Sequence, residues 1–274
     1  MRRATESDRP RIEALLARDP VQAMFPLANL ATFGWEGDHP YAVRFWLNDD
    51  GDVLAVTRSG LVLPVLPGGD SGGAAAALAG QEVSGLIGPA DQCRPLAGLL
   101  DLAGQPTLRD QDEPQFRLDL AALEVPPGPG ALQPLTAMPR LALVSWRRRY
   151  LAEIHGSTEA EMAEAADSEI ATYIAAGSHR VLMEGDTPLA MTGFNARLTE
   201  VVQVGGVYTP PVLRGRGHAR RAVALHLAEA MRTGARIATL LAASPAAQRA
   251  YEGLGFTRIG VWTMLMLRKP VRVG

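Results

Sequence analysis

Residues 204–219 read Val-Gly-Gly-Val-Tyr-Thr-Pro-Pro-Val-Leu-Arg-Gly-Arg-Gly-His-Ala, and the rest of the sequence is best interpreted from this stretch. Its first residues are β-branched and aromatic, which favours a strand. The strand must end at Pro210 and Pro211, because proline supplies no donor to a sheet ladder. From Ala219 to about Arg232, apolar residues recur at helical spacing. The stretch therefore predicts a strand, a glycine-rich turn and a helix.

The predicted glycine-rich turn is suited to bind an anion. The first amides of a helix lack intrahelical partners and lie at the positive end of the helix dipole. Gly215 and Gly217 carry no Cβ, so a phosphate can approach these amides closely. The glycines alone are explained equally well by an ordinary helix start. Further positive charge flanks them at Arg214, Arg216, Arg220 and Arg221.

Two motifs together resemble the GNAT N-acetyltransferases. Arg-x-x-Gly-x-Ala at 214–219, just after a strand ending in Tyr-Thr-Pro-Pro, resembles the loop with which that superfamily binds the pyrophosphate of acetyl-CoA. Residues 244–256 read Ser-Pro-Ala-Ala-Gln-Arg-Ala-Tyr-Glu-Gly-Leu-Gly-Phe and resemble its second signature, Asn-x-x-Ala-x-x-x-Tyr leading into Gly-Phe. Ser244 stands where the family usually has asparagine, and it is expected to be the N-cap of a helix that begins at Pro245. The resemblance covers roughly residues 140–268.

The resemblance implies a fold and a set of residues that contact the coenzyme. The fold is α/β (α+β), the GNAT acyl-CoA N-acyltransferase fold, with a mixed and mostly antiparallel sheet flanked by helices. Acetyl-CoA is the implied acyl donor. Its pantetheine arm is expected beside a strand that splays from its neighbour, where the Val207 amide polarises the thioester carbonyl. The residues implied to contact the coenzyme are Val207, Tyr208, Thr209, Arg214, Gly215, Arg216, Gly217, His218, Ala219, Arg220 and Ser244.

Tyr251 is the residue that the resemblance implies as general acid. GNAT enzymes commonly place at this position the group that protonates the departing CoA sulfur. A phenol, whose ordinary pKa is about 10, is suited to donate a proton at neutral pH. A structural interpretation stays open, because Tyr251 shares one apolar stripe with Ala247, Ala250 and Leu254.

The general base is not identified by the sequence. Some family members carry a glutamate on the strand before the loop, but counting back from Arg214 gives Gln203, whose amide accepts no proton at neutral pH. Glu200 lies three residues earlier and so on the opposite face of the strand. His179 and His226 are expected to be structural. The base must therefore be another residue or a chain of water molecules.

The implied function is direct transfer of an acetyl or other short acyl group from acyl-CoA to an amine of a small molecule or protein. The departures at Gln203 and Ser244 keep an alternative open, a non-catalytic acyl-CoA-binding or regulatory module. An unrelated nucleotide-phosphate binder is a third interpretation, although neither a Walker loop nor a dinucleotide fingerprint is present. The acceptor, the acyl-chain preference and the oligomeric state are not determined by the sequence.

Composition limits the partners of the protein. The 274 residues carry a formal net charge of -2, which gives no global basic field for nucleic acid or an anionic membrane. Cys93 is the one cysteine and is expected to be a buried structural thiol. No apolar run approaches the roughly 18 residues of a membrane span, and the histidines lack metal-ligand spacing. We therefore expect a cytoplasmic protein without a metal, nucleic-acid or membrane partner.

The chain is expected to contain two GNAT-like halves. Residues 1–124 echo the expected order of helices and strands but lack an arginine-glycine loop, so a structural or substrate-shaping role is assigned to them. Residues 125–139 are rich in proline and glycine and are expected to form a linker. Residues 140–274 are expected to form the catalytic domain. This layout resembles two-part bacterial GNAT proteins whose first half is a diverged copy of the second.

Two helices are expected to open the second half. Residues 143–154 interleave apolar side chains with an arginine run at 147–149, which is expected on a solvated face. Residues 158–175 are predicted to form the next helix. Its cap is expected at Ser157 or Thr158, with Glu161 completing a capping box.

Overall fold

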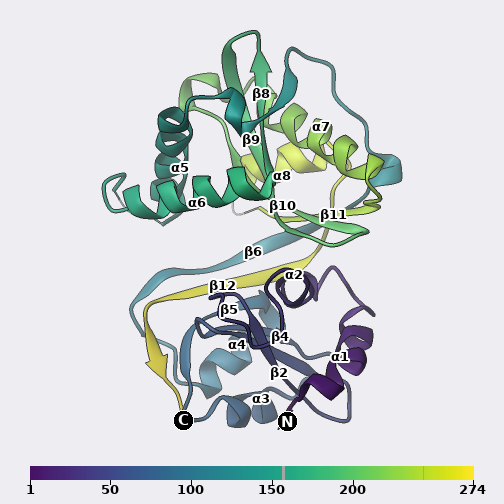
Figure 1. Ribbon diagram of the computed structural model, residues 1–274, viewed down its shortest axis with the longest axis vertical. Helices are drawn as coiled ribbons and strands as arrows, with labels where there is room; N and C mark the ends of the chain where they lie inside the picture. Colours follow the sequence, from purple (N-terminus) through teal and green to yellow (C-terminus); the bar gives the residue numbers. More distant parts are fainter. Residues whose placement is uncertain (156–157, 243) are drawn as a thin grey trace. The chain divides into compact units, whose positions relative to one another are not determined.

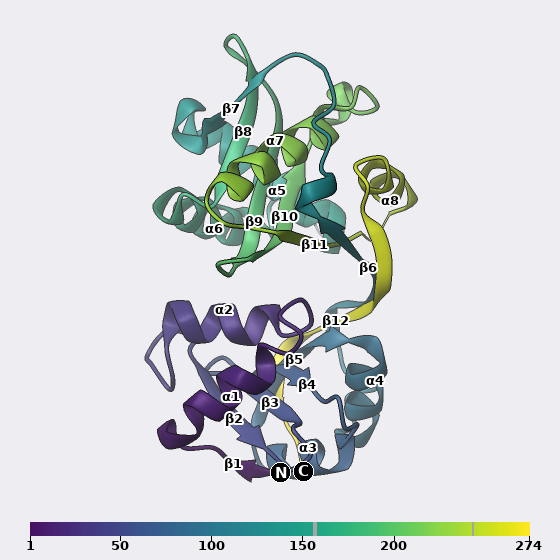
Figure 2. The same cartoon turned by 90° about the vertical axis from the view of Figure 1, so that its right-hand side faces the viewer.

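The order strand, two helices, three strands, helix, strand, helix, strand occurs twice along the chain (Figure 1). The computed structural model describes residues 1–155, 158–242 and 244–274. The described chain divides into two compact units, residues 1–115 with 259–274 and residues 116–258. Both chain ends lie in the first unit (Figures 1 and 2).

The first unit is a sheet in the order β1-β2-β3-β4-β5-β12 with two helices on each face. Its strand pairs are antiparallel except β4 with β5, which is parallel. The elements are β1 (Arg2–Arg3), α1 (Arg9–Leu16), α2 (Met24–Phe33), β2 (Val43–Leu47), β3 (Val53–Thr57), β4 (Leu61–Val65), α3 (Ser71–Leu78), β5 (Glu82–Pro89), α4 (Ala90–Leu99), β6 (Thr107–Asp119) and β12 (Thr257–Arg272).

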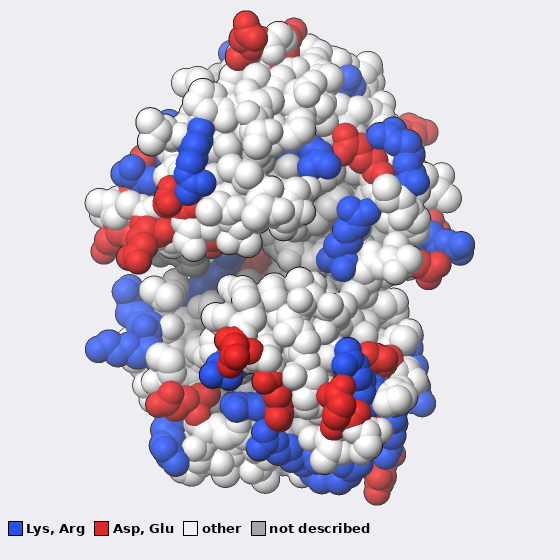
Figure 3. Space-filling view, viewed as in Figure 1, with Lys and Arg blue, Asp and Glu red and all other residues white. Residues whose placement is uncertain are grey.

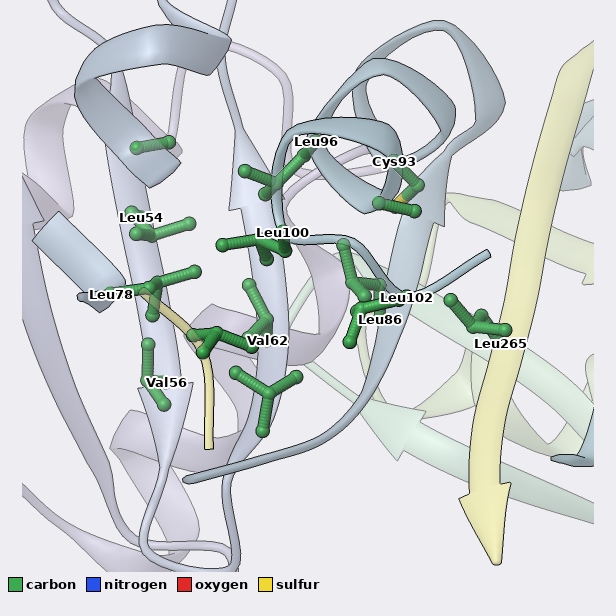
Figure 4. Close-up of a cluster of buried hydrophobic side chains, with 14 of the residues drawn as sticks. Leu54, Val56, Val62, Leu78, Leu86, Cys93, Leu96, Leu100, Leu102 and Leu265 are labelled. Atoms are coloured by element: carbon green, nitrogen blue, oxygen red, sulfur yellow. The ribbon is translucent and has the colours of Figure 1, made fainter. Parts of the chain in front are cut away.

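Alternation along the strands builds the two core layers of the first unit. In β3, Leu54 packs with residues of α3 and α4, while Val53 packs with residues of α1 and α2. Figure 4 shows the first of these layers, in which Leu78 of α3 and Leu96 of α4 point toward the strands. Cys93 is fully buried in the same layer, and burial raises the pKa of its thiol to about 12. The thiol therefore has the buried position expected of a structural cysteine.

The second unit is a sheet in the order β6-β11-β10-β9-β8-β7. Strands β7 to β10 pair antiparallel with their neighbours, and β10 pairs parallel with β11. The predicted mixed, mostly antiparallel sheet flanked by helices is thus confirmed. The further elements are β7 (Ala131–Pro134), α5 (Arg140–His155), α6 (Ala163–Ala176), β8 (His179–Glu184), β9 (Thr187–Arg197), β10 (Val201–Tyr208), α7 (His218–Arg232), β11 (Ile237–Leu241) and α8 (Pro245–Glu252).

Each unit takes its closing strand from the other half of the sequence. Strand β12 pairs with β5 from Trp262 opposite Pro89 onward, which places residues 259–274 in the first unit. The end of β6 lies beside β11, where the Thr239 hydroxyl donates to the Phe116 carbonyl at 3.0 Å. The compact units therefore differ from the ranges 1–124 and 140–274 expected from the sequence.

The proline- and glycine-rich segment expected to be a linker is held in the second unit. Residues 131–134 form β7, which pairs with β8. Ahead of it, the guanidinium of Arg221 donates to the carbonyls of Pro126, Pro129 and Gly130 at 2.6, 3.0 and 3.2 Å. Arg221 is therefore committed to this segment and is not available as a loose flanking charge for the glycine turn.

The arginine run of α5 is not uniformly solvated, contrary to the expectation from the sequence. Arg147 is buried, pairs with Glu169, and its guanidinium lies 4.5 Å from the ring centroid of Tyr150. Arg149 is exposed. Successive helical residues point in directions about 100° apart, so three in a row cannot share one environment. Compact packing of α5 on the sheet decides which of them is buried.

The predicted capping box forms ahead of the second helix. The Thr158 amide donates to the Glu161 carboxylate at 2.8 Å, and the Glu161 amide donates to the Thr158 hydroxyl at 3.3 Å. The helix itself begins only at Ala163, because a turn intervenes. Ser157, the other expected cap, lies outside the described residues.

Candidate functional site

Strand β10 leaves its parallel neighbour halfway along its length. Paired residues run from Val201 opposite Ile237 to Val204 opposite Leu240, whereas β10 continues to Tyr208. On the other edge, the register with β9 shifts between Gly205 and Tyr208, as at a β-bulge. The main chain around Val207 is therefore released from ladder pairing with β11 among the described residues.

The bulge makes room for a buried imidazole. Gly206 has a φ of 62°, and a Cβ on it would lie 2.5 Å from Nε2 of His179. The His179 ring also lies against Gly193 and stacks on Tyr173 with centroids 3.6 Å apart. Glycine is needed at both positions because any side chain would displace the ring.

His179 and His226, both buried in the second unit, are held neutral. Burial, with a contribution from Arg147, lowers the pKa of His179 well below its ordinary value. Burial likewise lowers the pKa of His226 to about 3, and its ring stacks on Phe194 with centroids 4.0 Å apart. A base whose pKa is depressed in this way holds a proton poorly at neutral pH. The structural role expected for both agrees with this burial.

The glycine turn after β10 presents an open helix start. Gly215 and Gly217 have φ values of 78° and 80°, which favour glycine, and a Cβ on either would meet nothing within 4 Å. Gly217 is the N-cap of α7 and has no side chain with which to cap the first amides. Open space and helix-start amides without a side-chain cap thus coincide at the positive end of a 15-residue helix.

The side chains around the turn differ in what they already contact. Arg214 donates to the Thr209 carbonyl at 2.9 Å and pairs with Glu153 of α5 at 2.8 Å. Arg216 is exposed, whereas the ring of His218 is buried as the first residue of α7. Arg220 is exposed, and Ala219 beside it is half-buried. The anchored Arg214 fixes the turn, while Arg216 and Arg220 present their charge to solvent.

Helix α8 carries the second motif. The Ser244 hydroxyl accepts from the Ala247 amide at 3.2 Å, so Ser244 is the N-cap expected from the sequence. Tyr251 packs against the same core cluster as Val207 and meets Phe256 edge-on, with centroids 5.9 Å apart. Burial, with a further contribution from Tyr150, raises the pKa of Tyr251 above its ordinary value. The structure thus brings the Tyr251 phenol and the bulge of β10 onto one cluster.

Neither Gln203 nor Glu200 offers the site an unpaired carboxylate. Gln203 is buried, and its Oε1 has no hydrogen-bond partner among the described residues. Glu200 precedes β10 instead of lying within it, and its carboxylate pairs with Arg236 at 3.3 Å.

Two residues near the site were missed by sequence reasoning. Glu153 of α5 pairs with Arg214. Tyr150, also on α5, contributes to the raised pKa of Tyr251. Neither belongs to a local motif, since both reach the site only through the packing of α5 on the sheet. A helix pattern alone gives no signal for them.

The described residues add limits on other ligands. No helix among them combines the length and apolarity needed to cross a membrane. Across residues 1–155, 158–242 and 244–274, no three His, Cys, Asp or Glu side chains gather as metal ligands would. On the face drawn in Figure 3, basic and acidic side chains are interspersed.

Comparison with known proteins agrees with this geometry. Residues 141–256 match the family described as the acetyltransferase (GNAT) family. This segment is therefore similar to a GNAT domain. Members of that family transfer acyl groups from acyl-CoA, and the family and fold support the same general chemistry here. A search among curated proteins finds no match.

Solved structures share the fold over nearly the whole chain. A GCN5-related N-acetyltransferase from Kribbella flavida is 16% identical, with a TM-score of 0.54 over 90% of this chain and 94% of that one. A GCN5-related N-acetyltransferase-like protein from Streptococcus suis is 13% identical, with a TM-score of 0.56 over 96% and 100%. A Drosophila protein is 12% identical, with a TM-score of 0.67 over 97% and 98%. At these identities the likeness concerns the fold alone.

Proposed function

We propose that the GNAT domain is an N-acetyltransferase that moves an acetyl group from acetyl-CoA directly to an amine. The observation that carries this proposal is the sequence of features along β10: pairing with β11 ends at Val204, a bulge follows at Gly206, and the chain then reaches the uncapped start of α7. These features together offer main-chain donors along an extended path. The extended pantetheine arm of acetyl-CoA, with the thioester at one end and the diphosphate at the other, matches such a path.

The diphosphate has a natural place at the start of α7. Amides of the glycine turn supply donors, and the helix dipole favours the negative charge. Exposed Arg216 and Arg220 add charge without having to break a buried pair. We assign the coenzyme contacts to the strand end Val207, Tyr208 and Thr209, to the turn and helix start Arg214, Gly215, Arg216, Gly217, His218, Ala219 and Arg220, and to Ser244.

The proposed reaction forms a C–N bond and breaks a C–S bond. The neutral amine attacks the thioester carbonyl carbon, while the Val207 amide stabilises the developing oxyanion. As the tetrahedral intermediate collapses, Tyr251 gives its phenolic proton to the departing sulfur. The extra proton on the new amide nitrogen leaves to water, and Tyr251 is reprotonated from solvent. Protons and electrons balance without an oxidant or a covalent enzyme intermediate.

Tyr251 is suited to donate a proton in this step. Its raised pKa keeps the phenol protonated at every physiological pH but also makes it a weaker acid, so the proton is transferred as negative charge develops on the departing sulfur. Its ring and the side chain of Val207 both pack against one core cluster. Catalytic and core roles are therefore compatible in one residue.

Water is the proposed acceptor of the amine proton. Gln203 is an amide and takes no proton at neutral pH. The neutral imidazoles of His179 and His226 have depressed pKa values and are weak bases. Turnover is therefore expected to rise with pH, because the ammonium group of the substrate loses its proton and becomes the free amine that attacks.

Thiol release from acetyl-CoA, measured with a panel of primary amines, tests the proposal. We expect amine-dependent release that saturates in both substrates. A non-catalytic acyl-CoA-binding module is favoured by the departures at Gln203 and Ser244. CoA would protect such a module against thermal unfolding, but the module would release no thiol from acetyl-CoA. Stronger protection by ATP than by CoA would instead indicate a nucleotide binder.

A further inference from the structure

A cavity of about 610 Å³ lies in the first unit, in a region that the proposed acyl transfer does not use. Its walls come from β1, β2, the turn between β3 and β4, and the residues that begin β5. Arg3, Arg44 and Arg58 line it together with a single acidic side chain, Glu82. Three arginines from three separate segments thus face one hollow.

Arg44 is the unusual member of this group. Its side chain is half-buried, its Nε is buried without a hydrogen-bond partner, and it forms no ion pair within the described residues. Its guanidinium lies 5.8 Å from the ring centroid of Trp46, and that of Arg3 lies 5.9 Å from the same ring. Burial and then the charge of Arg3 lower the pKa of Arg44, while Glu36 acts in the opposite direction.

The other two arginines are only partly neutralised. Arg3 pairs with Glu36 at 2.6 Å, and Arg58 lies 3.4 Å from Asp38, whose side chain is fully exposed. An exposed pair of this kind is weak and screened by salt. The walls therefore retain an excess of positive charge around Arg44.

We propose that this cavity binds a small molecule that carries a phosphate group. A partly buried cation without a counterion costs stability, so its presence in a wall points to an anion supplied from outside. A phosphate offers three oxygens and up to two charges, and it can therefore engage guanidinium groups from several directions. A carboxylate, with two oxygens and one charge, satisfies fewer of them.

Calorimetric titration of the full chain with inorganic pyrophosphate tests the site. The titration is run on Gly217→Glu, so that the helix start of the second unit is blocked, and on Gly217→Glu combined with Arg44→Gln. We expect the first protein to bind and the second to bind more weakly by on the order of tenfold to a hundredfold. Arg58→Gln in the same background is expected to weaken binding less. Equal affinity in folded Arg44→Gln protein overturns the site, and tighter binding of citrate than of pyrophosphate overturns the phosphate assignment.

Thermal unfolding separates a ligand site from a packing role. Because Arg44 has no carboxylate partner among the described residues, Arg44→Gln is expected to leave the melting temperature unchanged or raise it, whereas Arg3→Gln loses its pair with Glu36. Pyrophosphate is expected to raise the melting temperature of the Gly217→Glu protein and not that of the double variant. A destabilised Arg44→Gln protein with undiminished affinity would assign Arg44 to packing and contradict the proposal.

Discussion

The two units place a glycine turn and a helix after the fourth strand of each repeat, yet the two helix starts differ in what occupies them. In the first unit, Asp70 caps α3 by accepting from the Gly73 amide at 2.8 Å. The carboxylate of Asp52, fully buried, accepts from the amides of Gly68 at 2.5 Å and Asp70 at 3.0 Å. In the second unit, no side chain stands on the N-cap, Gly217.

This difference separates a closed helix start from an open one. In the turn before α3, main-chain amides donate to the carboxylates of Asp52 and Asp70, so these donors stabilise the fold and are not available to a ligand. At α7 the same kind of donors face open space. The comparison supports a structural role for the turn of the first unit and a ligand-binding role for that of the second.

The largest expected effect is from Gly217→Glu. A carboxylate at this position puts negative charge where the diphosphate is proposed to lie, and like charges in contact cost several kcal/mol. We expect CoA affinity to fall by on the order of a hundredfold or more, measured by calorimetry. Gly69→Glu is the matched control, because Gly69 has a φ of 79° and equally open space. Loss of CoA binding in the control as well would erase the contrast between the units.

The next effect is expected from Tyr251→Phe. Removal of a general acid lowers turnover by on the order of a hundredfold or more, with the affinity for CoA little changed. Steady-state kinetics with a single amine measures both quantities. Tyr150→Phe, on the neighbouring helix α5, is expected to change turnover far less. Full turnover in Tyr251→Phe would return Tyr251 to a purely structural role.

The closed helix start of the first unit makes a prediction about stability. Asp52→Asn keeps the size of the side chain but removes the charge that strengthens two hydrogen bonds to main-chain amides. We expect a loss of about 1–3 kcal/mol in the free energy of unfolding, measured by urea denaturation. CoA affinity should stay unchanged. An unaltered unfolding free energy would show that the buried carboxylate does not hold this turn.

The last expected effect concerns acid and develops only below neutral pH. The pKa of His226 is depressed to about 3 in the folded chain. Between about pH 6.5 and pH 3 the unfolded chain therefore binds a proton at this residue that the folded chain does not bind. Stability is therefore fully present above about pH 6.5 and falls toward pH 3, by at most about 1.4 kcal/mol per pH unit for this group. His226→Phe keeps the stacking on Phe194 and should flatten this dependence. His39→Phe in the first unit serves as control, and equal slopes in all three proteins would contradict the assignment.

Much of the second unit follows from local sequence, because its signals are local. Pro210 and Pro211 end the strand, glycines mark the turn, and Ser244 caps its helix as expected. The sequence did not predict that each unit takes a strand from the other half of the chain. Alternation in β6 and β12 predicts strands but does not indicate which neighbour they pair with. The sequence also did not predict the partners of Arg221 or the burial of Arg147, because both depend on contacts between segments that are separated in sequence.

The domain ranges illustrate the same limit. A proline- and glycine-rich stretch looks like a boundary, yet residues 131–134 pair as β7 and residues 126–130 are bound by Arg221. We propose that the first half is a diverged copy of the second whose helix start was closed by acidic side chains. The repeated order of elements in the two units supports this proposal.

A crystal structure of the full chain with acetyl-CoA tests the central claim most directly. The account predicts the diphosphate against the amides of residues 215–219, the thioester beside Val207 and the sulfur within reach of the Tyr251 hydroxyl. Coenzyme density at the start of α3, or anywhere else away from α7, would contradict it.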